Sequence, residues 1–92
     1  MAKFLMLGKY SIESMQEMSA QRTDKASKLI ESAGGKVESI HALIGQFDLA
    51  LLVDLPSMDA AVKTSIQLTK MSRIAFTTLP AIPVAEFDKL VG

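Results

Sequence analysis

Two apolar runs constrain the fold of this chain more than any other feature of its sequence. Residues 49–53 (LALLV) and residues 4–7 (FLML) contain no polar side chain. Because successive side chains of a β-strand point to opposite faces of a sheet, each run places apolar groups on both faces. Both runs therefore predict strands in the middle of a sheet that is covered on each side.

The rest of the chain predicts the elements around these runs. Strands are expected at residues 3–9, 36–44, 49–55 and 73–79, helices at 22–33 and 58–72, and a short closing helix at 84–91. Ser14 with Glu17 fits a capping box, which predicts a helical turn nearby. Gly34 suits the left-handed position that ends the first long helix. The apolar stripe of residues 58–72 is expected at Met58, Ala61, Val62, Ser65, Ile66 and Thr69.

Alternation along residues 36–44 predicts which side chains share a face. Ile40, Ala42 and Ile44 are expected on one face, and Val37, Ser39, His41 and Leu43 on the other. The proline-containing segment 80–83 is expected to break the fourth strand, with Pro83 at or near the start of the closing helix.

The element order βαββαβ predicts a single α+β domain over residues 1–92, with a ferredoxin-like fold. In this topology four antiparallel strands form one sheet, both long helices cover one face, and the first and third strands are central. The two apolar runs fall on those central strands. Since the helices cover only one face, the opposite face is expected to pack against a second copy of the chain. Leaving it in water would forgo about 1.5–3 kcal/mol per large side chain.

Charge and composition exclude several classes of partner. Ten basic and ten acidic residues balance without forming a basic stripe, so neither nucleic acid nor a membrane surface is an expected partner. The chain has no cysteine, and its apolar runs are too short to span a bilayer, so the cytoplasm is the expected location. No phosphate-binding loop, dinucleotide fingerprint or metal-ligand spacing is present, so neither a cofactor nor a metal ion is expected.

Short motifs follow one another along nearly the whole chain. Gly45, Phe47 and Asp48 stand in the segment IGQFDLALL. The other motifs are Tyr10-Ser11, Arg22, AGGKVES at 33–39, DLPSMDAAV at 54–62 and TTLPAIPVAEF at 77–87. In this order they resemble the GYD-domain family, small proteins named for a Gly-Tyr-Asp-like signature. Phe47 departs from the signature tyrosine, and Ser14 stands where the family often has glycine.

The resemblance implies a ferredoxin-like fold related to the dimeric α+β barrels. It implies no defined activity, because relatives in fold include cofactor-free monooxygenases, isomerases and ligand-binding regulatory modules. A role that needs the phenol hydroxyl of the signature tyrosine does not carry over to Phe47.

His41 is the only histidine and the candidate catalytic residue. Its position in the alternation places it on the face that meets the second sheet, where a neutral imidazole transfers protons near pH 7. The alternative is an edge-strand histidine that bonds to water or backbone.

Four further residues are candidates for ligand binding: Tyr10, Arg22, Asp48 and Thr78. Arg22 is expected at a helix start, where the macrodipole disfavours a cation, so an anionic ligand would explain its place there; the alternative is a salt bridge or a surface role. Tyr10 lines a cleft or packs at the sheet end, and Asp48 binds ligand or fixes its turn through backbone N–H groups.

Three functions follow from these observations. The first is a homo-oligomer that binds a small organic ligand in a largely apolar cleft, either between the helix layer and the sheet or between paired sheets. The second is a cofactor-independent enzyme of the monooxygenase or isomerase type that uses His41. The third is an assembly module without a ligand. The sequence does not decide whether the protein is an enzyme.

Overall fold

The computed structural model of the chain describes residues 1–92. Its elements follow in the order β1 (Ala2–Lys9), α1 (Ile12–Gln16), α2 (Ala20–Ser32), β2 (Lys36–Ala42), β3 (Leu49–Leu55), α3 (Met58–Ser72), β4 (Ala75–Ala81) and α4 (Val84–Val91). The strands form one antiparallel sheet in the order β2-β3-β1-β4. The α+β, ferredoxin-like prediction is confirmed, and β1 and β3 are the central strands as expected.

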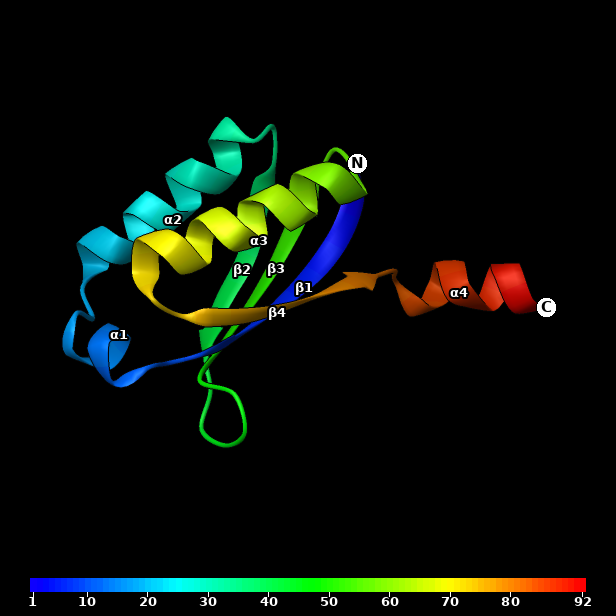
Figure 1. The fold of residues 1–92 in the computed structure, drawn as a ribbon. Helices are drawn as coiled ribbons and strands as arrows, with labels where there is room; N and C mark the ends of the chain where they lie inside the picture. The colour runs from blue at the N-terminus through cyan, green and yellow to red at the C-terminus, as the bar shows by residue number, and fades with distance from the viewer.

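Helices α2 and α3 lie side by side over one face of the sheet (Figure 1). The buried core lies between these layers and consists of Phe4, Met6, Ile30, Leu51, Val53, Leu55, Ala61 and Leu68. Every second residue of β1 and β3 enters this core, as the strand period requires.

The other face of the sheet has no helix over it, and we call it the helix-free face. Ser39, Leu52, Leu5 and Leu79 form one row across the four strands of this face, and His41, Ala50, Leu7 and Thr77 form the next row. Leu5, Leu7 and Leu52 are half-buried by their neighbours, while Leu79 on the edge strand is exposed. The central strands are therefore apolar on both faces.

A register shift in β2 changes the expected alternation. Val37 pairs with Val53, Ser39 pairs with Leu52, and Glu38 between them forms an irregularity. The shift puts Val37 and Ile40 on the helix side together, so the prediction that Val37 shares a face with His41 was wrong. A bulge adds one residue to one strand only, and the simple two-residue period does not reveal it.

The start of the helical region also differs from the prediction. The capping box is formed by Ser11 and Ser14, whose side chains each bond to the other's backbone N–H, rather than by Ser14 and Glu17. Helix α2 begins at Ala20 with Ser19 as its N-cap. Arg22 therefore still lies in the first turn of α2.

The face that α3 buries is rotated from the predicted stripe. Ala61, Thr64 and Leu68 are fully buried, whereas Met58, Val62 and Ile66 are each more than half exposed. The apolar residues of α3 cover a wider arc than the sheet and α2 can bury, because β4 lies at the edge of the sheet.

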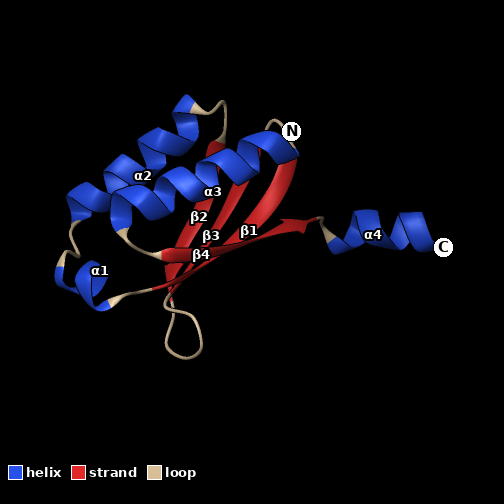
Figure 2. Ribbon diagram, viewed as in Figure 1, coloured by secondary structure: helices blue, strands red, loops and turns tan.

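The last strand passes through Pro80 and ends at Ala81, so the prediction that the proline segment breaks it at Leu79 was wrong. Strand β4 pairs only with β1, and proline is tolerated on such an edge because it lacks only one N–H donor. Pro83 is the N-cap residue of α4, and this helix extends away from the rest of the fold (Figure 2).

A tight glycine corner joins α2 to β2. Gly34 has φ +85°, and the N–H groups of Gly34 and Gly35 donate to the carbonyl oxygens of Glu31 and Ile30 at 3.0 Å each. This is the Schellman pattern that satisfies the last carbonyl groups of a helix. The predicted left-handed position of Gly34 is confirmed.

A charged cluster lies at one end of the sheet. The Lys3 ammonium donates to Glu38 at 2.5 Å and to Asp54 at 3.2 Å. These hydrogen bonds raise the pKa of Lys3 above its ordinary value of 10.5. Partial burial raises the pKa of Asp54, but the hydrogen bonds and charges of its neighbours, Lys3 first, together lower it below its ordinary value of 3.8.

The stability that Lys3 provides should depend on pH in the acid range. Because the pKa of Asp54 is lowered by folding, its contribution is present above its unfolded pKa and is lost as the pH falls through its folded pKa. The contribution of Lys3, whose pKa is raised, is lost only in strong alkali. Urea unfolding of Lys3→Met should therefore show a deficit against the wild type that is constant from about pH 5 to 9 and shrinks below about pH 4. A deficit that does not change down to about pH 2 would contradict the assignment.

None of the helices combines the length and the apolar character that a crossing of the bilayer requires.

Candidate functional site

A cavity lies between the helix layer and the sheet, at the end where β1 stops and α2 begins. We call it the Tyr10 pocket, and its volume is about 60 Å³. Its lining is mostly apolar. It comes from α2, α3 and all four strands or their ends: Tyr10, Arg22, Thr23, Ala26, Ile40, Leu49, Leu51, Leu68, Met71, Ser72, Ile74 and Phe76. A mostly apolar lining with a few polar groups at one side is the composition usual for a small-molecule site.

Tyr10 and Arg22 are the principal polar side chains of this pocket. The guanidinium carbon of Arg22 lies 5.6 Å from the centre of the Tyr10 ring, a cation–π distance. One guanidinium nitrogen of Arg22 donates to the backbone oxygen of Ser14 at 2.5 Å. No carboxylate lies within salt-bridge distance of Arg22. The half-buried cation therefore has donors left for a ligand, since a guanidinium carries five N–H groups.

Local structure holds both residues in place. Ser19 caps α2 by accepting from the backbone N–H of Arg22, which fixes the first turn of that helix. The short helix α1 lies between Tyr10 and α2 in the chain. Ser11, just before α1, donates to the backbone oxygen of Arg73 at 2.9 Å, which connects this segment to the loop between α3 and β4. The side of α2 that carries Arg22 and Ala26, one helical turn apart, then faces the cavity.

Asp48 holds the backbone of Tyr10 in place without lining the pocket. Its carboxylate accepts from the backbone N–H of Tyr10 at 2.9 Å and lies 3.9 Å from the Lys9 ammonium. Its own backbone closes the turn, donating to Gly8 and accepting from Leu43 at 2.8 Å each. Asp48 does not line the cavity, so the geometry matches the turn-fixing alternative for this residue.

Removal of the Asp48 carboxylate should loosen the end of β1. In Asp48→Ala the N–H of Tyr10 loses a charged acceptor, and we expect the free energy of unfolding to fall by about 1–2 kcal/mol. Asp48→Asn keeps an acceptor oxygen and should lose less. Urea unfolding of the three proteins measures the difference, and equal stability of Asp48→Ala and wild type would show that the bond does not contribute.

The remaining two candidates lie elsewhere. Thr78 lies on β4 in a separate groove, where its hydroxyl is 2.7 Å from that of Ser65. His41 is exposed on β2, in the helix-free row with Ala50, Leu7 and Thr77. The structure thus brings Tyr10, Arg22 and Asp48 together and places Thr78 and His41 away from them.

Sequence reasoning missed two polar residues of the lining, Thr23 and Ser72. Thr23 lies one residue after Arg22 and one turn before Ala26, so the helical period of α2 was a signal for it. The hydroxyl of Ser72 donates to the oxygen of Leu68 and accepts from the N–H of Ile74, which makes it part of the end of α3. No group of three or more metal-ligating side chains gathers anywhere in the fold.

Comparison with known proteins agrees with this fold. A crystal structure of the leucine response regulatory protein of Mycobacterium tuberculosis superposes with a TM-score of 0.59 at 13% sequence identity. The match covers 89% of this chain and 51% of the regulator, so this chain corresponds to about half of that protein. At this identity the likeness concerns the fold alone. A search of curated proteins finds no match. The family model of the GYD domain matches residues 4–91, nearly the entire sequence, and the chain therefore belongs to the GYD-domain family.

Proposed function

We propose that this protein is a homo-oligomeric binding domain whose Tyr10 pocket takes a small organic anion. The ligand's carboxylate or similar group would lie against Arg22, and a short apolar group would enter the cavity. The observation that carries the proposal is the half-buried Arg22, which has no acidic partner and lies over the ring of Tyr10 beside an apolar cavity.

Charge favours an anion. Arginine remains protonated at any physiological pH, and its planar fork matches the two oxygens of a carboxylate. The single bond to the Ser14 backbone leaves the rest of the guanidinium without a protein acceptor. A ligand anion at this place would also offset the unfavourable position of a cation in the first turn of α2.

Size limits the ligand. A cavity of about 60 Å³ has room for roughly four groups of the size of a water molecule. The enclosed part of the ligand is therefore a short aliphatic group, which Ala26, Leu51, Leu68 and Phe76 would contact. A longer ligand would extend past Arg22 toward the solvent.

Self-association is supported by the helix-free face. Leu5, Leu52 and Leu79 form an apolar row across three neighbouring strands, with Leu7 and Ala50 in the next row. A continuous apolar surface of this kind on a small domain marks an interaction site. A second copy of the same sheet would cover it face to face.

The enzyme alternative receives less support. His41 lies on the helix-free face and lines neither the Tyr10 pocket nor the two hollows beside α3. A proton-transfer group must lie within hydrogen-bond reach of its substrate. We therefore propose binding rather than catalysis.

The binding proposal can be tested with a panel of short-chain carboxylates, matched amines and matched alcohols. Isothermal titration and protein-observed NMR should show that carboxylates bind and that shifts gather at Tyr10, Ala26 and Phe76. Arg22→Met keeps an apolar stem and removes the charge. It should weaken carboxylate binding by about 10- to 100-fold, the loss expected for a charged hydrogen bond.

Arg73→Met is the matched control, because Arg73 is the only other arginine, is exposed and does not line the pocket. It should bind like the wild type. Native mass spectrometry of protein purified from its source would report both the oligomer and a retained small acid. Equal binding of carboxylates and amines, or unchanged affinity in Arg22→Met, would overturn the proposal.

A further inference from the structure

We propose that α4 is an exchanged arm that docks into a groove between α3 and β4 of a second copy of the chain. The inference rests on the self-association proposed above and adds a second contact to it. Two unpartnered apolar surfaces on the same molecule carry it, one convex and one concave.

The convex surface is α4 itself. None of its residues is buried, and Val84, Phe87, Leu90 and Val91 are 73, 52, 78 and 66% exposed. Their spacing of three and four residues puts them on one side of the helix, opposite the charged residues. Figure 1 shows α4 beyond the end of β4, away from the helix layer and the sheet. The radius of gyration of 13.6 Å exceeds the value of about 12 Å expected for a compact domain of this length.

The concave surface runs along the side of α3 that faces β4, and we call it the α3 groove. It consists of two adjoining hollows that share Ser65 and Ile66. Its apolar lining includes Met58, Val62 and Ile66, each 53 to 55% exposed, with Phe4 and Phe76 at its floor. Three residues that were predicted for the buried stripe of α3, Met58, Val62 and Ile66, thus line an open groove instead, whereas Ala61 is buried as predicted.

The groove is long enough to hold the arm. An eight-residue helix is about 12 Å long, and the stretch of α3 from Met58 to Lys70 covers about 18 Å. The groove therefore holds the whole of α4 with one apolar residue of the arm against each turn of α3. Val84 would lie near Ile66, Phe87 near Val62 and Leu90 near Met58 if the two helices run antiparallel.

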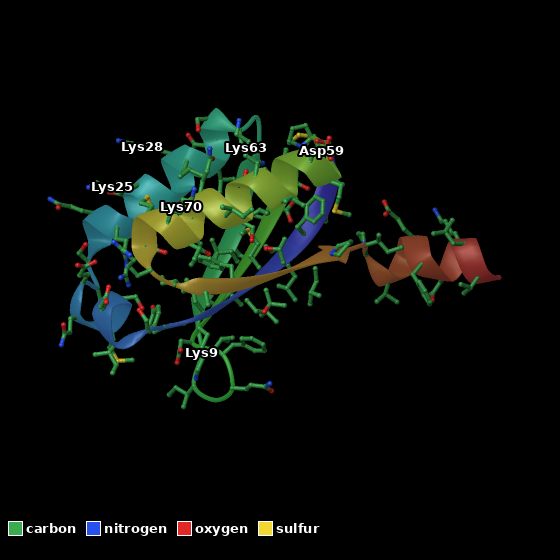
Figure 3. The ribbon with its side chains drawn as sticks, in the orientation of Figure 1. Lys9, Lys25, Lys28, Asp59, Lys63 and Lys70 are labelled. Carbon is green, nitrogen blue, oxygen red and sulfur yellow. The ribbon has the colours of Figure 1, made fainter.

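Charge favours the antiparallel direction. Figure 3 shows Asp59 at one end of α3, with Lys63 and Lys70 farther along it. Lys70 is part of the groove wall, and neither it nor Asp59 has an ion-pair partner within its own chain. In this antiparallel register Glu86 lies at the level of Lys63, and Lys89 lies at the level of Asp59. The parallel arrangement would instead bring Glu86 toward Asp59.

The occupant is assigned to a second copy because α4 already leaves its own groove empty. Only Ile82 and Pro83 connect β4 to α4, and Pro83 holds an extended backbone with φ −58° and ψ 141°. One short helix buries less than the roughly 800 Å² per partner of a standard interface. The arm therefore reinforces the pairing of the helix-free faces.

Cross-linking tests the arm directly, because the chain contains no cysteine. Leu90→Cys and Met58→Cys are made as separate variants, mixed, and treated with a short bismaleimide. We expect a covalent dimer that contains one chain of each variant. Lys25→Cys, on the outer side of α2 (Figure 3), replaces Met58→Cys as the matched control and should give no such product with Leu90→Cys.

The outcomes distinguish the proposed exchange of α4 from the proposed pairing of the helix-free faces. Phe87→Glu should abolish the mixed cross-link and weaken dimerisation at least about tenfold, while light scattering still finds a dimer at high concentration. An internal cross-link in the Leu90→Cys, Met58→Cys double variant, without a mixed dimer, would show that α4 returns to its own groove and would overturn the proposal. A wild-type dimer without any cross-link would overturn the arm alone, and a monomeric wild type would overturn both proposals.

Discussion

Leu52→Glu is expected to be a folded monomer at micromolar concentrations, at which the proposed wild-type dimer persists. Leu52 lies at the centre of the helix-free face, paired with Leu5 on one side and Ser39 on the other. In a face-to-face dimer each copy would bury one unpaired carboxylate, which costs several kcal/mol per group. A total of at least about 4 kcal/mol weakens the dimer at least about a thousandfold.

Light scattering coupled to size exclusion measures the change, and circular dichroism checks that the monomer stays folded. Lys25→Glu is the control, because Lys25 is exposed on the outer side of α2 and should leave the dimer intact (Figure 3). The variant's own fold should persist, since Leu52 is only half-buried in the single chain. A Leu52→Glu protein that remains a dimer would exclude the helix-free face as the interface.

Gly35→Ala is expected to be the most destabilising single methyl addition in the chain. A Cβ at this position would lie 2.5 Å from the backbone oxygen of Asp54 and 2.6 Å from a methyl carbon of Leu55. Backbone and a fully buried leucine cannot yield easily, so the corner between α2 and β2 must shift. We expect a loss of about 2–4 kcal/mol, a large share of the stability of a small domain.

Gly34→Ala distinguishes the cost of a steric clash from the cost of a strained backbone conformation. At Gly34 the nearest atom to an added Cβ is the Pro56 Cγ at 3.4 Å, but φ is +85°. The cost there is about 1 kcal/mol of backbone strain without a clash. The Tm of Gly35→Ala should be well below that of Gly34→Ala. Both are measured at the same protein concentration, because the Tm of a self-associating protein would depend on concentration. The reverse order would show that the corner accommodates the methyl group.

The sequence predicted the fold well because its signals were local and strong. Two apolar runs identified the central strands, and Gly34 identified the end of the first long helix, as the structure confirms. The errors came from properties that depend on neighbours. The bulge at Glu38 moves Val37 to the other face, and the exposed side of α3 reflects the lack of a strand beyond β4.

The site was predictable only in part. Arg22 was singled out because a cation in the first turn of a helix needs an explanation, and the structure places it beside Tyr10. The pairing itself depends on the path of α1, which no residue pattern reveals. Thr78 carried no signal of its own beyond the family resemblance, and its bond to Ser65 belongs to a different part of the surface.

The position of Tyr10 also makes the protein its own optical reporter. The chain has one tyrosine and no tryptophan, so all of its tyrosine emission would come from a ring that lines the cavity beside Arg22. An anion that draws the guanidinium away, or an alkyl group that displaces water from the ring, changes the surroundings of that one chromophore. Purified small acids that do not absorb in the tyrosine range can therefore be screened against this domain without a label.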